Sequence, residues 1–595
     1  MGTWPAAPLI EAQQVVISEI HYQPAGGTAF AEAEFIELLN SGNQSADLGG
    51  AVFKGGIAFT FPAGYRLAAG QRIVLCRNSP QFVARYGSVA QLMPGNYTGA
   101  LNNSGETLLL TSASGAVLTE VRYGVTGEWP SRAAGQGSSL ELVDPAGPQN
   151  LPTNWRASTE YHGSPGTAGT GPLNRVVINE LLAHTDPPLE DAVELYNRTD
   201  TTLSVGGWYL SNSLDEPTRF RIPSGTTLPP RGFLVLYESQ FYPATPEGDR
   251  VPFTFGAARG DAVVLTSADG AGRLLRFEDV QSFPASPNGV SFGRYPDGIG
   301  PFLLMSRMTL GTEVVNLDPP EWITLFRQGR GSSNAPHRIG PVVFNRIRYS
   351  AAAGEIEFVE LLNISGSEVP LFDPFYPAHT WAIEGGITFQ FPEPESLPPG
   401  GRIVVAGTSD FAAVRALLAL PASVPVVGPY SGQLSAEGEE LRLVRPDPPQ
   451  QPPRSDAGFV PYYVVEKISY SALAPWPLLE LSASQLIQRR VGDAAGYDAA
   501  NWGAALIKAP QFVAQLKVLS ASGGLLRLNL TGRPSSHYEL ESVEIAGGGT
   551  VLSQAIVASG IWATPPAVLA DLGLVSIQID LPLGNGLRLY RLRAR

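Results

Sequence analysis

The sequence predicts an all-β protein made of β-sandwich domains in tandem, and three observations carry this prediction. The chain has 595 residues, which is long enough for about four domains. It contains 65 Gly and 52 Pro, and frequent turn signals separate many short apolar runs, a pattern typical of sandwiches. One heptapeptide also recurs within the same order of predicted strands, at residues 34–40, 191–197 and 357–363.

Four predicted strands accompany every copy of the heptapeptide in a fixed order. A β-branched run precedes it, and a strand resembling Phe-x-Phe-Pro follows it. Alternation in that strand buries one face, and its proline ends it because proline has no N–H for the ladder. A Pro/Gly turn then leads to an apolar run, and a strand resembling Gly-Glu-x-Leu-x-Leu completes the set. The blocks span 15–20, 55–62, 67–75 and 105–110 in the first copy, 176–181, 218–223, 228–236 and 260–265 in the second, and 342–347, 385–392, 397–405 and 438–443 in the third.

The length of the repeat separates it from a solenoid. The glutamates Glu37, Glu194 and Glu360 recur roughly every 160 residues, whereas solenoid repeats span roughly 20–50 residues. Each copy is therefore expected to have a hydrophobic core of its own.

In this order the blocks resemble the lamin tail domain family, in the form that bacterial members tend to show. The first copy matches best, because it adds a Trp-Pro pair at 129–130, an Asn-Trp pair at 154–155 and the closing Gly-Ser-Pro-Gly at 163–166. The resemblance implies an immunoglobulin-like β-sandwich for each copy. It also implies a scaffold or interaction role without catalysis.

The other two copies depart from the family pattern. The second has Phe-Pro at 283–284 in place of Trp-Pro and lacks the Asn-Trp pair. The third has Arg346 in place of the glutamate of the opening strand and a Pro-rich insertion at 447–454. It keeps the pairs at 476–477 and 501–502.

These patterns predict six segments. The stretch at 163–172, rich in Gly, Pro and Thr, is expected to be a short flexible linker. The last segment resembles a small C-terminal β-sandwich of exported bacterial modular proteins. The segments are a lead-in (1–14), lamin-tail-like domains at 15–170, 174–312 and 337–512, a linker or packed strap at 313–336, and a C-terminal β-sandwich at 513–595.

A few segments fall outside the strand pattern. Residues 81–86 and 410–418 are the best candidates for short helices. The Pro-rich insertion is expected to be an exposed loop with some polyproline II character. The glycine-rich run at 546–550 is interpreted as a hairpin loop.

Charge and composition weigh against several classes of protein. The net charge of −14 argues against nucleic-acid binding, which usually needs a basic face. No apolar run of about eighteen residues is present, so no membrane span is expected. The N-terminus lacks the pattern of a signal peptide. By analogy with exported modular β-proteins, Met1 is expected to belong to a mature, trimmed or incomplete form, and the location is expected to be extracellular or at the cell surface.

The single cysteine, Cys76, lies in an apolar predicted strand and cannot form a disulfide within the chain. We interpret it as a buried small hydrophobic residue rather than a reactive or metal-binding thiol.

Acidic residues at matching positions are the main candidates for chemistry. Neighbouring strands could bring Glu19, Glu34 and Glu37 together as oxygen ligands for Ca²⁺. Residues i and i+3 of a strand point to opposite faces, however, so Glu34 and Glu37 cannot share a site without a bulge. We therefore expect structural or solvated roles. The matching residues of the second copy are Glu180, Asp191 and Glu194.

The remaining polar and aromatic candidates suggest structural roles. The asparagines that end the heptapeptides are expected to cap the following turn, and the recurring tryptophans favour core packing over an exposed sugar platform. The histidines have no metal spacing, and those after the opening strands are expected in loops. These residues are Asn40, Asn197 and Asn363; Trp129, Trp155, Trp476 and Trp502; and His21, His162, His184, His337, His379 and His537.

The sequence contains no nucleophile elbow, no phosphate loop and no Cys–His pairing, so we assign no catalytic, cofactor-binding or metal-binding residue. The first hypothesis is a non-enzymatic extracellular structural or adhesive protein, which binds protein, cell-surface or polysaccharide partners or its own copies through sheet edges and loops. The alternative is a polysaccharide- or surface-binding accessory region of a larger exported enzyme. A hydrolase with an unrecognised carboxylate site is a third hypothesis.

Overall fold

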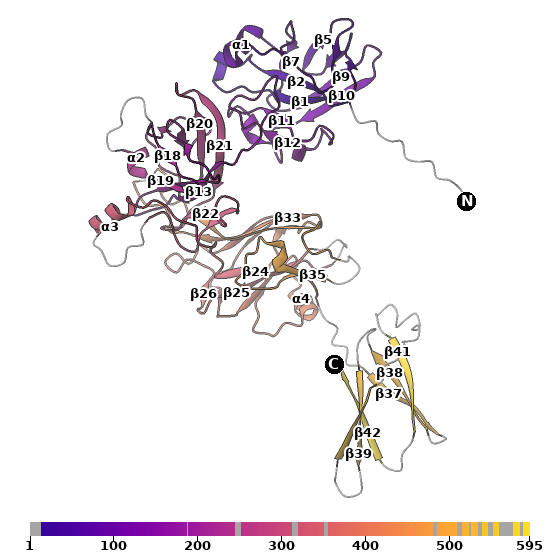
Figure 1. Cartoon of the computed structure of the whole chain (residues 1–595). Coiled ribbons are helices and arrows are strands. Elements are labelled where there is room, and N and C mark those ends of the chain that lie inside the picture. Colours follow the sequence, from indigo (N-terminus) through magenta and orange to yellow (C-terminus); the bar gives the residue numbers. More distant parts are fainter. Residues whose placement is uncertain are drawn as a thin grey trace.

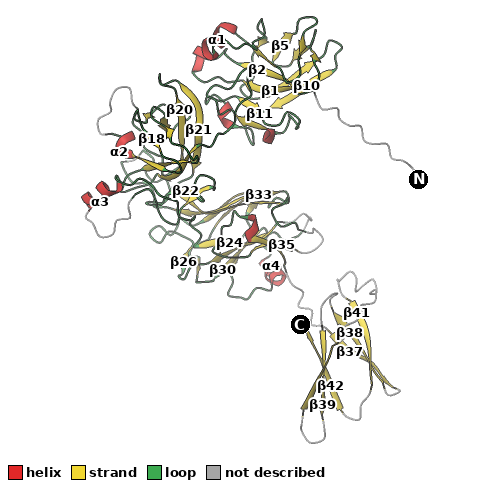
Figure 2. Cartoon of the chain, viewed as in Figure 1, coloured by secondary structure: helices red, strands yellow, loops and turns green. Residues whose placement is uncertain are grey.

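Antiparallel strands dominate the computed structural model, and its helices are short (Figure 2). The structure describes residues 14–186, 189–243, 251–311, 319–349, 355–453, 455–479 and 485–507, and the backbone of six further strands between 515 and 594. The predicted all-β fold of immunoglobulin-like sandwiches is confirmed, and the three repeats follow one another along the chain (Figure 1).

The first repeat folds into two five-stranded sheets, ordered β12-β11-β1-β2-β7 and β10-β9-β4-β5-β8. Apolar side chains that alternate along the strands meet between the sheets, among them the buried Ile36, Leu38 and Leu108. The strands are β1 (Val15–His21), β2 (Phe35–Asn40), β4 (Val52–Lys54), β5 (Ile57–Thr60), β7 (Arg72–Cys76), β8 (Thr98–Gly99), β9 (Glu106–Thr111), β10 (Val117–Tyr123), β11 (Leu140–Leu142) and β12 (Trp155–Ala157), with a small pair, β3 (Ala46–Asp47) and β6 (Arg66–Leu67).

The second repeat has the same architecture, with sheets ordered β19-β14-β13-β22-β23 and β17-β16-β20-β21. Ile178, Val193 and Leu265 lie in its core. The strands are β13 (Val176–Leu182), β14 (Ala192–Asn197), β16 (Tyr209–Ser211), β17 (Phe220–Arg221), β19 (Phe233–Tyr237), β20 (Asp261–Ala268), β21 (Leu274–Phe283), β22 (Phe292–Arg294) and β23 (Phe302–Leu304), with the pair β15 (Leu203–Ser204) and β18 (Thr227–Leu228).

The third repeat has sheets ordered β31-β30-β25-β24-β35-β36 and β32-β28-β27-β33-β34. Its core includes Phe344, Leu361 and Trp381. The strands are β24 (Val342–Arg348), β25 (Phe358–Asn363), β27 (Ala382–Gly385), β28 (Ile387–Gln390), β30 (Arg402–Ala406), β31 (Val426–Val427), β32 (Ser431–Gly432), β33 (Gly438–Pro446), β34 (Tyr462–Ser471), β35 (Gln485–Arg489) and β36 (Trp502–Leu506), with the pair β26 (Val369–Pro370) and β29 (Ser396–Leu397).

The C-terminal segment contributes two three-stranded sheets, ordered β37-β38-β41 and β40-β39-β42. The glycine-rich run at 546–550, interpreted as a hairpin loop, lies outside the described residues between the antiparallel strands β39 and β40. The strands are β37 (Gln515–Ser522), β38 (Leu525–Gly532), β39 (Tyr538–Ile545), β40 (Val551–Val557), β41 (Val575–Pro582) and β42 (Leu587–Ala594).

Two short helices lie where the sequence predicts them. They are α1 (Ser79–Tyr86) and α4 (Phe411–Leu418), and each begins after a side chain that accepts a backbone N–H of the first turn, Asn78 and Asp410 respectively. The other helical segments were not predicted: α2 (Glu238–Phe241), α3 (Pro319–Phe326), and the 3₁₀ turns η1 (Gly27–Phe30), η2 (Ser131–Ala133), η3 (Pro152–Asn154) and η4 (Ala499–Asn501).

Residues 319–336 pack against the second sandwich. Phe326, at the end of α3, is buried against Tyr237 of β19, with ring centroids 5.2 Å apart. The chain then runs over β13 and β14, where the side chain of Asn334 donates to the carbonyl of Asn179 at 2.9 Å. The stretch is therefore in contact with the second sandwich, while the predicted domain boundaries stay predictions.

The opening strand of every repeat carries a β-bulge at the same place. In each pairing of the opening strand with the heptapeptide strand, one extra residue enters after the third position, and the register slips. The slip turns the fifth residue of the opening strand to the same face as the central heptapeptide glutamate. These facing pairs are Glu19 with Glu37, Glu180 with Glu194, and Arg346 with Glu360.

The first sandwich supplies backbone partners to an edge strand of the second (Figure 1). The N–H of Tyr161 donates to the carbonyl of Leu275 in β21 at 2.9 Å, and the N–H of Phe277 donates to the carbonyl of Thr159 at 2.8 Å. Between them, the guanidinium of Arg276 donates to the Thr159 hydroxyl at 2.9 Å and to the Gly171 carbonyl at 2.9 Å. The two sandwiches are thus joined by strand pairing and by a cation.

The stretch predicted to be a flexible linker is held along its length, so that prediction is wrong for these residues. The N–H of Gly166 donates to Glu37 at 2.8 Å, and the N–H of Thr170 donates to Glu160 at 3.1 Å. The Arg276 contact then fixes Gly171. The composition of the stretch indicates flexibility, but it does not report Glu37 and Arg276, which hold the backbone from distant parts of the chain.

The second and third sandwiches are also in direct contact. Ala285, just after β21, forms a bridge with Tyr463 of β34, and Tyr463 packs into the core of the second sandwich. The Pro-rich insertion folds back on itself through a hydrogen bond from the Gln450 N–H to the Phe459 carbonyl. Phe459 then lies beneath the guanidinium of Arg259, 3.6 Å from its ring centroid. The insertion, expected to be an exposed loop, thus leads into the interdomain contact.

Candidate functional site

A cluster of carboxylates lies on the outer face of the first sandwich, beneath the closing loop of the repeat. Glu37 alternates with the core residues of β2 and therefore points outward, yet it is buried. One of its oxygens accepts from Ser18 Oγ at 2.6 Å, and the other accepts from the Gly166 N–H at 2.8 Å. Glu19 accepts from the hydroxyl of Ser139 and from the N–H of Ser164. These donors hold the loop against the sheet.

Burial sets the protonation of this cluster. It raises the pKa of Glu37 to about 7, although the hydrogen bond from Ser18 and the Arg72 guanidinium, 3.3 Å away, act in the opposite direction. Burial also raises the pKa of Glu19 well above its usual range, and repulsion from Glu37 and Glu141 adds to this. The cluster therefore favours the protonated state relative to exposed carboxylates.

The second sandwich repeats the arrangement, with donors from the segments around Thr309 and Ser332. Glu180 accepts from the N–H of Thr309 at 2.9 Å and from the hydroxyl of Ser291. Glu194 accepts from the side chain of Asn179 at 2.8 Å and from the N–H of Ser332 at 3.2 Å. Burial raises the pKa of Glu194 well above its usual range, with repulsion from Glu180 as the next cause.

The third sandwich replaces the carboxylate pair with an ion pair. Arg346 occupies the position of Glu19 and Glu180, and its Nε donates to Glu360 Oε1 at 2.9 Å. Glu360 is fully buried, and the guanidinium neutralises its charge, whereas in the other copies the matching carboxyl group accepts a hydrogen bond from a covering segment. The Arg346 departure seen in the sequence therefore changes how this face is stabilised.

Of the two roles expected for these acidic residues, structural or solvated, the structural role fits, because all of them are buried. Glu34 and Glu37 do point to opposite faces, as expected, and both are buried. Glu34 accepts from the Tyr97 hydroxyl and the Leu101 N–H, both at 3.0 Å, and burial raises its pKa to about 7. Asp191 has the matching place in the second repeat, and burial raises its pKa to about 7. In the part of the chain that the structure describes, no group of three or more ligating side chains is arranged around a metal site.

A second set of polar side chains serves one backbone N–H of each opening strand. On the side away from the heptapeptide strand, each opening strand pairs only from its fifth residue onward, so the N–H of its third residue has no ladder partner and a side-chain acceptor must satisfy it. In the second repeat Asp279 accepts from the Ile178 N–H at 2.9 Å, and in the third Glu466 accepts from the Phe344 N–H at 2.6 Å. Each carboxylate pairs with a cation, Arg294 at 3.0 Å and Arg489 at 2.6 Å.

In the first repeat the corresponding N–H is satisfied by an uncharged side chain. Gln149 Oε1 accepts from the Ile17 N–H at 3.0 Å, and Thr119 holds the Gln149 side chain through a hydrogen bond of 3.1 Å. In the strand register, Thr119 occupies the position of Asp279 and Glu466. Leu142 occupies the position of Arg294 and Arg489. The first repeat therefore has neutral residues at both positions, whereas the second and third repeats have an acidic and a basic residue there.

Several expectations for single residues are confirmed. The Asn40 carboxamide caps its turn by accepting from the Gly42 N–H at 3.0 Å and also donates to the Leu67 carbonyl at 2.8 Å. Asn197 and Asn363 make the corresponding contacts. Cys76 is fully buried, and burial raises the pKa of its thiol.

The structure also places the histidines after the opening strands and the recurring tryptophans. His21 is wrongly placed in a loop by the sequence, because it is the last residue of β1 and is fully buried. Burial lowers its pKa to about 3, with the charge of Arg85 as a further cause. His184 does lie after β13 in a loop, as expected. Trp155, Trp476 and Trp502 are buried and pack in the cores, which excludes them as an exposed sugar platform.

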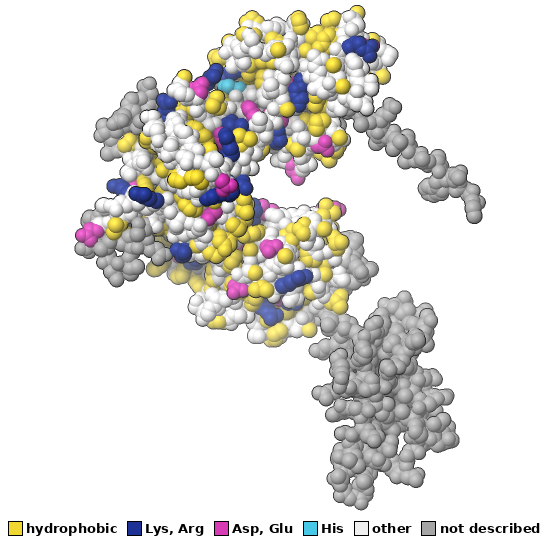
Figure 3. All heavy atoms as spheres, viewed as in Figure 1, with side chains coloured by type: hydrophobic (Ala, Val, Ile, Leu, Met, Phe, Trp, Pro, Cys, Tyr) yellow, Lys and Arg dark blue, Asp and Glu magenta, His cyan; other side chains and the backbone are white. Residues whose placement is uncertain are grey.

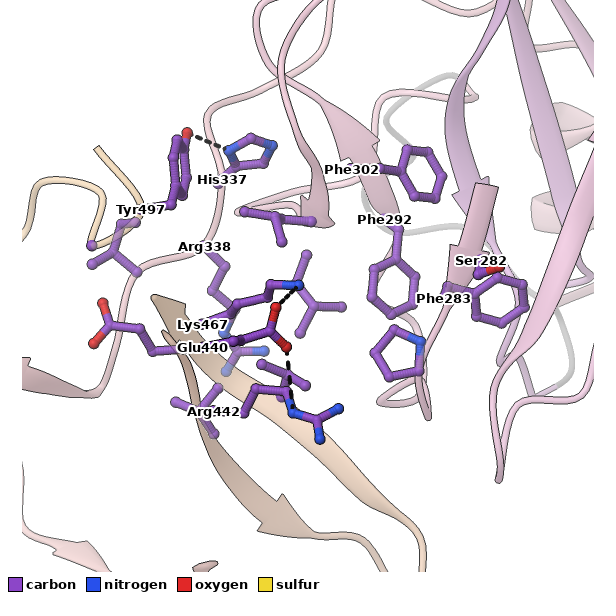
Figure 4. Close-up of a pocket in the computed structure, with 18 residues that line it drawn as sticks. Ser282, Phe283, Phe292, Phe302, His337, Arg338, Glu440, Arg442, Lys467 and Tyr497 are labelled. Atoms are coloured by element: carbon purple, nitrogen blue, oxygen red, sulfur yellow. Dashed lines mark hydrogen bonds and ion pairs between the residues drawn. The ribbon is translucent and has the colours of Figure 1, made fainter. Parts of the chain in front are cut away.

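A cavity of about 380 Å³ lies between the second and third sandwiches (Figure 4). Phe292 and Phe302 of the second sandwich form one wall, and Lys467 of the third lies on the other. His337, in the connecting segment, bridges the two domains by contacts with the Tyr497 hydroxyl at 2.8 Å and the Gly293 carbonyl at 3.0 Å. No sequence motif indicated this cavity, because its walls come from three distant stretches of the chain.

Charged side chains on the face shown in Figure 3 are scattered among uncharged ones, and apolar side chains gather where the second and third sandwiches meet. Within the described residues, no helix is both long and apolar enough to cross a membrane.

The profile of the Lamin Tail Domain family matches residues 10–125 and 170–275. The first two sandwiches are lamin tail domains. The matched regions cover the heptapeptide strands and the carboxylate pairs of both repeats. No curated protein matches the chain.

The lamin tail domain is a non-catalytic immunoglobulin-like family of the protein-interaction type, which gives this part of the chain a modular structural or binding role. In the first two sandwiches the buried carboxylates accept hydrogen bonds from segments of the same chain that pack over the sheet, so they help to hold those segments in place. The third sandwich has the same strand arrangement and the same bulge.

Proposed function

We propose that the chain is a non-enzymatic structural protein of the cell exterior, which holds its domains in a fixed array and binds protein or cell-surface partners, its own copies among them. The direct docking of consecutive sandwiches carries this proposal. The Arg276 contacts and the pairing of β21 with residues 159–161 favour a stiff array over a string of independent binding modules.

Sheet edges are the surfaces by which such an array would associate. β10 is the end strand of its sheet, and its first residue, Val117, is 55% exposed. The corresponding end strand of the second sandwich, β21, already accepts a segment of the first. Edge pairing between copies would extend the same mode of contact from within the chain to neighbouring chains.

The second hypothesis, a polysaccharide-binding accessory region, has less support. Sugar-binding platforms need exposed aromatic rings, and the recurring tryptophans Trp155, Trp476 and Trp502 are buried.

Light scattering coupled to size exclusion tests the proposal over a wide range of protein concentration. We expect reversible growth from the 63.2 kDa monomer into larger species as the concentration rises. A Val117→Lys variant places a charge at the β10 edge and should reduce this growth, whereas Val491→Lys, at an exposed site of the third sandwich, should not. A monomer at every concentration would reject self-association.

A further inference from the structure

The cavity between the second and third sandwiches has two chemically different walls (Figure 4). Phe292 and Phe302 line one side, with ring centroids 6.2 Å apart and nearly parallel planes at 17°. Arg338, Arg442 and Lys467 line the other side, two of them in contact with Glu440. A volume of about 380 Å³ falls within the range of small-molecule sites.

The aromatic wall lies where the other two repeats have a pair of indoles. Phe302 pairs with Arg294 between the last two strands of its sheet. The equivalent pairs are Trp155 with Leu142 in the first repeat and Trp502 with Arg489 in the third. Trp155 packs against a second indole, that of Trp129, at 6.2 Å, and the third repeat has the same arrangement at 6.0 Å. The second repeat lacks this second indole. Phe283, expected from the sequence at the place of the Trp-Pro pair, instead pairs with Asp261 and stands at the register position of Tyr123 and Tyr470. Smaller rings thus leave room for a flat apolar group.

The opposite wall favours a negative charge. Glu440 is shared by Lys467, at 2.5 Å, and Arg442, at 3.7 Å. Arg442 also lies 3.5 Å from Glu384, outside the cavity lining. The other acid of the lining, Glu466, is paired with Arg489. The exposed Arg338 has no carboxylate partner among the described residues, and the buried Nε of Arg442 has no hydrogen-bond acceptor there. Cationic groups with unused hydrogen-bond donors therefore face the aromatic wall.

We propose that this cavity binds a small aromatic anion, with its ring beside Phe302 and its acid group directed to Arg338 and Arg442. Planar guanidinium groups bind carboxylates through paired hydrogen bonds, and an aromatic ring packs against phenylalanine faces. This site is independent of the scaffold role, because it lies inside the interdomain contact and uses no free sheet edge.

Isothermal titration of the full chain with 2-naphthoate tests the proposal, with 2-naphthylmethylamine as the matched cation. We expect saturable binding of one naphthoate per chain and binding of the amine at least tenfold weaker. Arg338→Gln should weaken naphthoate binding about tenfold, whereas Arg122→Gln, exposed on β10, should leave it unchanged.

A second variant removes the space rather than the charge. Phe302→Trp restores the ring that the other repeats have at this position, so it should fill the cavity and abolish naphthoate binding while the domain stays folded. Loss of the naphthoate signal with an unchanged circular dichroism spectrum supports the site. Absence of saturable binding to the unmodified chain, equal affinity for acid and amine, or unchanged binding to both Arg338→Gln and Phe302→Trp overturns the proposal.

Discussion

Glu37 shows how a buried acid can hold a loop in place. Its two oxygens connect β1, through Ser18, with the closing loop, through the Gly166 N–H. Both contacts survive protonation, because the carboxylic acid can donate to the Ser18 hydroxyl while its other oxygen still accepts from the N–H. Ionisation instead places a charge where water is excluded, which is unfavourable.

The pKa of Glu37, raised to about 7, makes the stability of the first lamin tail domain depend on pH. The folded state binds the proton more tightly than the unfolded state, so stability is greatest below about pH 4.5 and is lost as pH rises to about 7. Glu37→Gln mimics the protonated acid. We expect nearly equal stability at pH 4 and a gain of about 1–3 kcal/mol at pH 8. Hydrogen exchange of peptides from β1 and β2 measures this difference.

Glu120→Gln is the matched control, because Glu120 is exposed on β10. It should leave the exchange of β1 and β2 unchanged at both pH values. A Glu37→Gln variant that is less stable than the unmodified chain at pH 8 would show that ionised Glu37 is stabilising.

At the scale of one element, the bulged opening strand determines which polar residues each core must contain. The unpaired N–H needs an acceptor, and the three repeats supply Gln149, Asp279 and Glu466. A charged acceptor then requires a buried cation, which the first repeat avoids. One unpaired backbone N–H in each repeat therefore accounts for the partly buried Asp279–Arg294 pair and the buried Glu466–Arg489 pair.

A double-mutant cycle in the third sandwich tests this dependence. Glu466→Gln alone leaves Arg489 buried without a counter-charge and should cost about 3–5 kcal/mol. Arg489→Leu alone leaves Glu466 unpaired and should cost a similar amount. The double variant approaches the neutral arrangement of the first repeat, so its loss should be smaller than the sum of the two. Scanning calorimetry measures the three variants, and additive losses would refute the coupling.

The strands and their order could be predicted from the sequence because apolar alternation and turn residues are local signals. The same holds for α1 and for the turn caps at Asn40. The bulge could not be predicted, since no glycine or proline marks it, and Gln149 lies more than one hundred residues from the N–H that it satisfies. The burial of Glu37 was missed for the same reason, because its cover, the loop at Gly166, is distant in sequence.

At the scale of the whole molecule, Arg276 joins two domains and their connecting segment. Its guanidinium contacts Thr159 and Gly171 from the first repeat while its backbone lies in β21 of the second. The composition of the linker gave no sign of this, because the residue that fixes it lies about one hundred positions later.

Replacement of Arg276 should loosen the array. Arg276→Ala removes a charged donor from three acceptors and should weaken docking by about 2–5 kcal/mol. Small-angle X-ray scattering should then show a larger radius of gyration and a broader distribution of distances. Arg273→Ala is the control, because the Arg273 side chain is 81% exposed and pairs only locally with Asp269. This variant should leave the scattering unchanged. Identical profiles for all three proteins would mean that Arg276 does not hold the domains together.

The fixed linker also bears on how long the protein survives among hydrolytic enzymes. Proteases cleave segments that can detach and extend into their active sites, and a stretch rich in Gly, Pro and Thr is ordinarily such a segment. Here the backbone between Gly166 and Gly171 is held by Glu37, Glu160 and Arg276, so a cut must wait until the two domains separate. The docking of the first two domains thus protects the peptide bonds that connect them.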